Sequence, residues 1–230
     1  SWIFPRDPQC AEKAGRILDL YERVWQGHPL QDDEFVLSAD EKTSIQARRR
    51  RHATYPAQLS APMKVEHEYI RCGAWAYIAA LDVHRAKVFG RCERRTGIAA
   101  FGRLVDEVMC QPPYATARRV FWIVDNGSSH RGARSIERLQ SRYANLVLVH
   151  APVHASWLNQ IEIYFSILQR KALTPNDFKS MEALDERLLG FQRYYEQIAK
   201  PFEWKFTRND LSLVLNKIKL AHLTSARLAA

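Results

Sequence analysis

The 230-residue sequence predicts an α/β domain built on a mixed five-stranded sheet with helices on both faces. Residues 120–124 are an unbroken run of Val, Phe, Trp, Ile and Val, which is typical of a strand buried on both faces in the middle of a sheet. Three strand patterns precede this run, and helix and strand patterns alternate around and after it. The first three strands are therefore predicted to be antiparallel, and the later ones to join them in a mixed sheet.

The predicted elements follow in order from the N-terminus. Asp7-Pro8 predicts a helix start, with a capping aspartate and proline at the first helical position, and this helix ends before Gly27. A tight connection at His84-Arg85 predicts a hairpin. Pro112-Pro113 ends the helix before the central strand. The predicted strands are 35–40, 74–83, 86–89, 120–124 and 146–149, and the main helices are 101–108, 135–143 and 157–173.

Composition narrows the functional class. The net charge is +9, and arginine dominates it, with 24 Arg and 10 Lys among 34 basic residues. Because the planar guanidinium suits phosphate oxygens, this bias favours a polyanionic partner, although a basic but inert surface remains an alternative. No apolar run approaches the roughly 20 residues of a membrane span, and the start resembles neither a signal nor a transit peptide, so we expect a cytoplasmic protein with no membrane partner.

Motifs for several other chemistries are missing from the sequence. The four cysteines are far apart and form no CxxC pair, which indicates neither a zinc site nor a disulfide framework. The sequence contains no GxxxxGK[ST] loop for a nucleoside triphosphate and no GxSxG elbow for a serine hydrolase.

Two of the predicted strands end in an aspartate, Asp40 and Asp125. Open α/β sheets bind ligands at the carboxyl edge of their strands, so the two carboxylates are expected to meet there. Like charges that close repel each other unless a cation lies between them. Asp40 shares its strand face with Ser38, whereas Glu41 points to the opposite face and is expected to have a supporting or structural role.

A third carboxylate is predicted on the helix over 157–173. Apolar residues cover most of this helix, which indicates that it is largely buried, and one narrow stripe is polar. A buried carboxylate needs a partner. For Glu162 this partner is a metal shared with Asp40 and Asp125, or, alternatively, an arginine. Three carboxylates without a Cys or His cluster favour a hard cation, Mg²⁺ or Mn²⁺. The polar stripe consists of Asn159, Glu162, Ser166 and Gln169.

Two groups of arginines are candidate DNA contacts. Each follows a predicted site acid closely in the sequence, which favours phosphate binding. The alternatives are a solvated edge strand for the first group and the polar face of an amphipathic helix for the second. The two arginine groups are Arg48, Arg49, Arg50 and Arg51, and then Arg131, Arg134, Arg138 and Arg142, of which the second group is spaced three, four and four.

Farther along the sequence, Phe202, Trp204 and Phe206 are interpreted as a hydrophobic anchor.

Four short segments carry a family resemblance. They are Ser38-Ala-Asp-Glu-Lys-Thr43, Val124-Asp-Asn-Gly-Ser-Ser-His130, His154-Ala-Ser-Trp-Leu-Asn-Gln-Ile-Glu162 and Pro201-Phe-Glu-Trp-Lys205. The first three resemble the acidic motifs of mariner-like bacterial transposases of the insertion sequence 630 family, and the fourth is similar to that family's C-terminal signature. Residues 126–161 place 36 residues between the second and third acids, within the family's usual range.

The resemblance implies an RNase H-like catalytic domain of the DDE superfamily over residues 35–175. A linker helix region over 1–34 would precede it, without the helix-turn-helix domain usual in the family, and a helical region over 176–230 would pack on it. The implied catalytic residues and metal ligands are Asp40, Asp125 and Glu162, holding Mg²⁺, or Mn²⁺ as a substitute, as two ions. Residues implied to support the ligands or to contact DNA are Glu41, Asn126, His130 and Asn159.

The implied activity is metal-dependent DNA cleavage and strand transfer during transposition of an insertion sequence. The implied partners are double-stranded DNA, as transposon ends and a TA-containing target, and a second copy of the chain in a homodimer. The implied place of action is the bacterial nucleoid. Two alternatives remain: a truncated or inactive transposase that only binds DNA or partner subunits, and another RNase H-like nuclease such as a resolvase or an RNA–DNA hybrid cutter.

Overall fold

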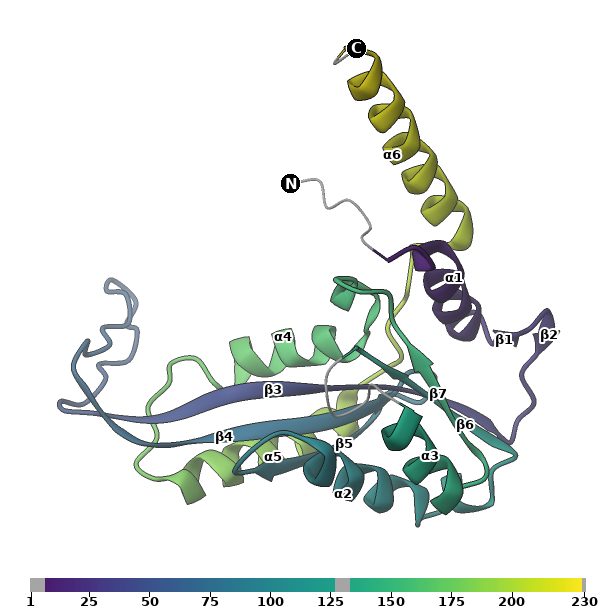
Figure 1. Ribbon diagram of the computed structural model, residues 1–230. Coiled ribbons are helices and arrows are strands. Elements are labelled where there is room, and N and C mark those ends of the chain that lie inside the picture. Colours follow the sequence, from purple (N-terminus) through teal and green to yellow (C-terminus); the bar gives the residue numbers. More distant parts are fainter. Residues whose placement is uncertain (1–6, 127–132, 229–230) are drawn as a thin grey trace.

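A five-stranded mixed sheet forms the centre of the computed structural model, which describes residues 7–126 and 133–228 (Figure 1). The strand order is β5-β4-β3-β6-β7. β3 runs antiparallel to β4 and parallel to β6, β4 is antiparallel to β5, and β6 is parallel to β7. The predicted mixed five-stranded sheet is confirmed. The strands are β3 (Glu34–Arg50), β4 (Tyr69–Asp82), β5 (Lys87–Glu93), β6 (Arg119–Val124) and β7 (Leu146–His150), with a separate short pair, β1 (Val24–Trp25) and β2 (His28–Pro29).

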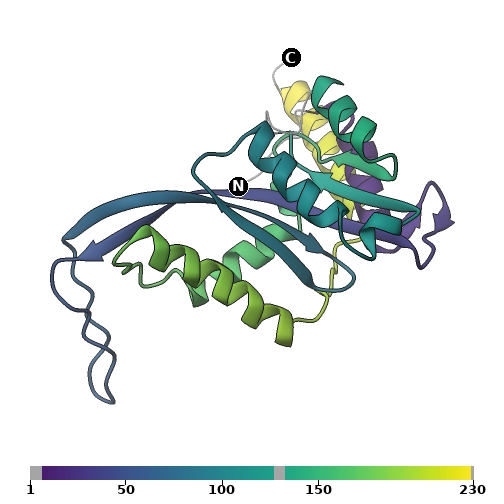
Figure 2. The same ribbon diagram turned by 90° about the horizontal axis from the view of Figure 1, so that it is seen from below.

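Helices cover both faces of this sheet (Figures 1 and 2). α2 and α3 pack on one face, and α1, α4 and α5 pack on the other. The last helix, α6, contacts α1 and extends away from the sheet (Figure 1). The helices are α1 (Cys10–Tyr21), α2 (Ile98–Met109), α3 (Ala133–Arg142), α4 (Ile161–Lys171), α5 (Met181–Ile198) and α6 (Arg208–Leu228), with short 3₁₀ helices η1 (Tyr114–Thr116) and η2 (Ser156–Leu158).

The central strand β6 is buried on both faces, as predicted. Val120, Trp122 and Val124 pack in the core beneath α2, whereas Phe121 and Ile123 pack in the core beneath α1. Side chains alternate along a strand, so the residue after Val124 continues the α1 side. Burial of β6 therefore fixes the direction in which the chain leaves the sheet.

β3 and β4 are longer than the sequence predicted. The ladder between them runs from Leu37 opposite Asp82 to Arg50 opposite Tyr69. Beyond Lys42 the two strands extend past the other strands as a two-stranded ribbon, whose base is covered on one face by α4 and α5, and we call residues 43–75, including the tip, the arm (Figure 2). The arm was missed because only a few of its β3 residues, Ile45 and Ala47 among them, are buried apolar side chains, and because bulges interrupt its pairing.

The predicted helix over 157–173 is two pieces in the structure, η2 and α4. Asn159 separates them with an extended backbone, at φ −88° and ψ 106°. Asn159 therefore does not continue the helical stripe of Glu162. The prediction of a largely buried helix is wrong on this side, because Glu162 is exposed and only the face of Ile161, Phe165 and Leu168 is buried. Among residues 7–126 and 133–228, no helix is long and apolar enough to cross a membrane.

Candidate active site

Asp40 and Asp125 lie at the same edge of two neighbouring parallel strands. The last printed pair of the β3–β6 ladder is Ser38 opposite Ile123. Two residues farther, the same register brings Asp40 beside Asp125, on strands that are about 4.8 Å apart. Asp40 continues the strand face of Ser38, as the sequence predicted, and Asp125 follows directly after β6.

Both oxygens of the Asp40 carboxylate accept a hydrogen bond. Oδ1 accepts from the backbone N–H of Glu41 at 2.7 Å, and Oδ2 accepts from Asn159 Nδ2 at 3.2 Å. The pKa of Asp40 is raised to about 7: burial is the largest cause, the hydrogen bond from the Glu41 N–H works against it, and the negative charges of Asp125, Glu162 and Glu41 also raise this pKa. Two carboxylates from other parts of the chain, and that of the adjacent Glu41, thus repel the charge of one buried carboxylate.

Glu162 stands in the first turn of α4, with its side chain exposed. Its charge reaches Asp40. In the part of the chain that the structure describes, however, no three His, Cys, Asp or Glu side chains are grouped closely enough to hold a metal ion. The acids thus interact through their charges at a wider separation than a closed set of metal ligands.

A buried polar pair connects β3 to the start of α4. Asn159 is 1% exposed; its Oδ1 accepts from Ser38 Oγ, and its Nδ2 also donates to the carbonyl of Ala39 at 3.0 Å. Ser38 is fully buried, and its Oγ accepts from the N–H of Ile161 at 2.9 Å. The sequence reading missed Ser38, although a polar residue inside the otherwise apolar run 35–39 was the available signal.

Asn126 fixes the segment that follows Asp125. Its Nδ2 donates to the carbonyl of Ala151 at 2.5 Å, which joins the end of β6 to the residues after β7. A cavity of about 370 Å³ lies beside Asp125 and is lined by Asn126 and residues 151–156. His130, predicted as a supporting residue, lies outside the described residues.

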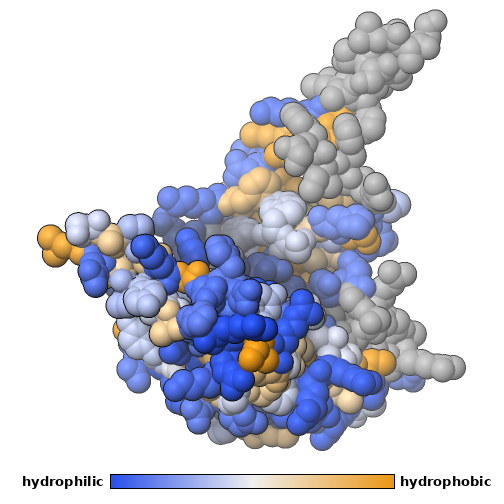
Figure 3. Space-filling view, turned by 90° about the vertical axis from the view of Figure 1, so that its left-hand side faces the viewer, coloured by the Kyte–Doolittle hydropathy of each residue, from blue (hydrophilic) through white to orange (hydrophobic). Residues whose placement is uncertain are grey.

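The first arginine group lies in the arm and not beside the carboxylates. Arg48 is eight residues beyond Asp40 along β3, a strand length of roughly 25 Å. The first arginine group is therefore near Asp40 in sequence but not in space, and its role as a DNA contact stays a prediction. The guanidinium carbons of Arg48 and Arg50 lie 4.6 and 5.4 Å from the ring centre of Tyr69, whereas Arg49 is exposed on the opposite strand face. The end of the molecule from which the arm projects is mainly hydrophilic (Figure 3).

The remaining candidate arginines differ in their pairing. Arg51 pairs with Glu68 at 3.3 Å, and Arg142 pairs with Asp106 at 2.9 Å, which partly neutralises both. Arg138 is exposed on α3. Arg131 and the side chain of Arg134 lie outside the described residues.

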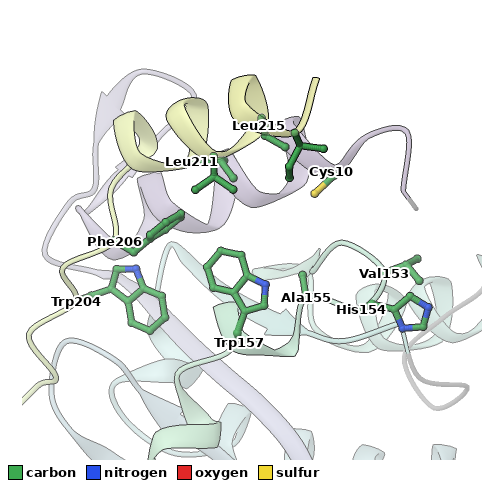
Figure 4. Close-up of a pocket in the computed structure, with 11 residues that line it drawn as sticks. Cys10, Val153, His154, Ala155, Trp157, Trp204, Phe206, Leu211 and Leu215 are labelled. Carbon is green, nitrogen blue, oxygen red and sulfur yellow. The ribbon is translucent and has the colours of Figure 1, made fainter. Parts of the chain in front are cut away.

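The predicted aromatic anchor is confirmed. Phe206 packs edge-on against Trp157, with ring centres 5.1 Å apart, and Trp204 packs against Tyr21, also at 5.1 Å. The rings of Trp157, Trp204 and Phe206, together with residues of α1 and α6, border an apolar groove of about 420 Å³ (Figure 4). The anchor therefore holds the C-terminal segment to α1 and the η2 region.

Comparison with known proteins places the chain in a family. The DDE superfamily endonuclease family matches residues 36–185, which is 150 of 230 residues and includes all three candidate acids. No curated protein matches the chain.

Solved structures share the fold at low identity. The Mos1 mariner paired end complex with Mn matches with a TM-score of 0.56 and 17% identity, covering 86% of this chain and 60% of that chain. The pre-cleavage Mos1 transpososome matches with a TM-score of 0.53 and 11% identity, covering 96% and 65%. The chain thus spans less than two thirds of the Mos1 chains. By its family match, and with the RNase H-like fold of the mariner transposase catalytic domain, the chain belongs to the DDE superfamily endonucleases.

Proposed function

We propose that this chain is the catalytic domain of a transposase that cuts double-stranded DNA and transfers the freed strand to a target. Asp40, Asp125 and Glu162 are its metal ligands and catalytic residues. The observation that carries this proposal is the strand register that brings Asp40 beside Asp125 in a chain of the DDE superfamily endonucleases, and the effect of the Asp125 and Glu162 charges on the pKa of Asp40 supports it. The acids come from β3, the end of β6 and the start of α4, three elements that the fold brings to one edge.

The donor atoms fit a hard divalent cation. Carboxylate oxygens suit Mg²⁺ and Mn²⁺, and a cation offsets the repulsion that Asp125 and Glu162 exert on Asp40. Solved structures of Mos1 include one with Mn and one with Mg. We propose two ions, the arrangement in which each of the attacking and leaving oxygens of a phosphodiester has its own metal.

When bound, the metal ions would activate a water or a 3′-hydroxyl for in-line attack and stabilise the leaving oxygen. The chain's own residues orient the ligands. The N–H of Glu41 and the amide of Asn159 fix both oxygens of Asp40. Asn126 holds the segment after β7 beside Asp125. Arginines, among them the exposed Arg138, would neutralise DNA phosphates. No nucleophilic side chain is needed, because the attacking group is water or the DNA itself.

The partners follow from the same proposal. We infer that the substrates are transposon ends and a TA-containing target, and that two copies of the chain act together on the bacterial nucleoid. The net charge of +9 supports a DNA substrate. Solved Mos1 structures include paired-end complexes, which supports an assembly that holds two DNA ends.

The test is a set of acid-to-amide variants of this chain. Asp40→Asn, Asp125→Asn and Glu162→Gln should each lower Mg²⁺-dependent nicking of supercoiled DNA by about a thousandfold, the loss of several kcal/mol of transition-state stabilisation. Glu186→Gln, which changes an exposed acid on α5, is the matched control and should keep full activity. Full activity in any of the three variants removes that residue from the site.

Two further measurements separate the alternatives. Joining of a labelled DNA end to a target plasmid distinguishes a transposase from a nuclease that only hydrolyses. Binding of Mn²⁺, followed by its electron paramagnetic resonance signal, distinguishes an active chain from one that only binds DNA. A chain that binds DNA but neither cuts it nor binds Mn²⁺ would contradict the proposal.

A further inference from the structure

The segment directly before Glu162 is tied to β3 by buried hydrogen bonds. Ser38 Oγ accepts from the N–H of Ile161, the first residue of α4, at 2.9 Å, and donates to Asn159 Oδ1. Ser38 is separated from Ile161 by 123 positions in the sequence. The start of this helix is therefore positioned by a residue of the central sheet.

The same segment is tied to α1 from the other side. The hydroxyl of Tyr21 donates to the carbonyl of Leu158 at 2.5 Å and accepts from the N–H of Gln160 at 3.3 Å. Burial raises the pKa of Tyr21, so the hydroxyl keeps its proton and can donate. The ring of Tyr21 rests against Trp204, which fixes its direction. Residues 158–161 are thus held between α1 and β3, two elements that lie more than 100 positions earlier in the sequence.

The hydrogen bonds continue to the first metal-site acid. Asn159 Nδ2 donates both to the carbonyl of Ala39 at 3.0 Å and to Asp40 Oδ2 at 3.2 Å. Ser38 and Asn159 are 0% and 1% exposed, so water does not compete for these bonds. One connected network therefore touches Asp40 at one end and the first turn of α4, which carries Glu162, at the other.

The start of α5 shows that this arrangement is not a general feature of helix starts in the chain. α5 is capped by its own preceding residue, since Ser180 accepts from the N–H of Ala183. At α4 the preceding residue, Gln160, provides no side-chain cap, and Ser38 of β3 binds the first helical N–H instead. A local cap fixes only the helix end, whereas this one also fixes its distance from the sheet.

We propose that Ser38, Asn159 and Tyr21 form a positioning clamp that sets the separation between Asp40 and Glu162. The clamp thereby sets the affinity of the site for divalent metal ions, and this second part rests on the proposed function. The three residues are positioning residues, because they act on the acids and not on the substrate. Supporting groups of this kind typically change metal affinity ten- to a hundredfold.

The first test uses the chain without metal. Hydrogen exchange, measured by NMR at single amides, should be about tenfold faster at Ile161 in Ser38→Ala and at Gln160 in Tyr21→Phe, because each variant removes the acceptor of that N–H. Tyr21→Phe removes only the hydroxyl and keeps the ring packed against Trp204, so faster exchange in this variant would not come from general unfolding. The matched control is Tyr114→Phe, which loses a buried hydroxyl bonded to Asp82 at 2.8 Å in the core beneath α2. It should leave both amides unchanged.

The second test measures Mn²⁺ affinity in the same four proteins by electron paramagnetic resonance. Ser38→Ala and Tyr21→Phe should weaken binding at least tenfold, and Tyr114→Phe should not. Unchanged Mn²⁺ affinity in both clamp variants, despite faster exchange, would overturn the proposal, because the network would then serve stability alone. If the unaltered chain binds no Mn²⁺, the metal site itself is refuted, and exchange decides the clamp: faster exchange supports its positioning role, and unchanged exchange overturns it.

Discussion

The two halves of β3 have opposite surroundings although they belong to one continuous strand paired to the same neighbour. Residues 34–39 are all buried between helices, whereas most residues from Lys42 to Arg50 in the second half are partly or fully exposed. We call residues 34–40 and 119–125 the mount, since these parts of β3 and β6 carry Asp40 and Asp125. In the arm, helices cover only one face, where Ile45 and Ala47 pack in the core beneath α4 and α5, whereas helices pack on both faces of the mount. Enclosure on both faces lets the mount hold a carboxylate in a fixed direction.

The largest expected difference between the two regions is in stability. Trp122→Ala in the mount should lower the free energy of unfolding by about 3–5 kcal/mol, because it opens a cavity where the indole packs against Phe101. Urea unfolding followed by circular dichroism measures this change. Trp122→Phe keeps a ring in place and should cost much less. A loss below about 1 kcal/mol for the alanine variant would show that the mount is not tightly packed.

A smaller effect is expected from the ion pair at the start of the mount. Glu34 is 2% exposed and pairs with Arg119. Burial raises the pKa of Glu34, but the hydrogen bonds from the Gln31 N–H and Arg119 and the arginine charges outweigh it, so the pKa is lowered overall. Glu34→Gln should cost about 1–3 kcal/mol at pH 7.

The pH dependence of this cost has a defined sign. Because the folded-state pKa of Glu34 lies below the unfolded value near 4.3, its stabilisation is fully present above that value. It is lost as the pH falls through the lower folded-state pKa. Urea unfolding of both proteins at pH 7 and at pH 3 measures the difference. An equal difference at the two pH values would contradict the assigned ion pair.

The smallest change in stability is expected in the arm. Arg49→Gln and Arg71→Gln alter exposed residues and should change the free energy of unfolding by less than about 0.5 kcal/mol. If the arm contacts DNA phosphates, each variant should lower the slope of log affinity against log salt by about 1. Arg193→Gln, on exposed α5 surface, is the control. An unchanged slope in both arm variants would limit the arm to a structural role.

The mount was predictable from sequence and the arm was not. The apolar run at residues 120–124 and the alternation before Asp40 depend on burial, and burial leaves a pattern in the sequence. The arm buries few side chains, among them Ile45 and Ala47, and its positive φ at Ser44 and its register shifts interrupt their alternation. The sequence therefore predicted the strands that are buried on both faces and missed a ribbon that is buried on one face only.

The surroundings of the acids were predictable only in part. Strand parity correctly placed Asp40 on the face of Ser38. The helix of Glu162 was predicted to begin four residues too early, because the apolar pattern continues through η2 while the backbone of Asn159 does not. Hydrogen bonds of Ser38 and Tyr21 to residues more than 100 positions away depend on tertiary packing, which no local pattern reports.

A crystal structure of the chain with Mn²⁺, with the metal located by its anomalous scattering, would show whether Asp40, Asp125 and Glu162 share a metal site. We expect a Mn²⁺ peak between the carboxylates of Asp40 and Asp125, with the Glu162 carboxylate completing the site. Saturating Mn²⁺ bound elsewhere, with these three carboxylates free of metal, would contradict it.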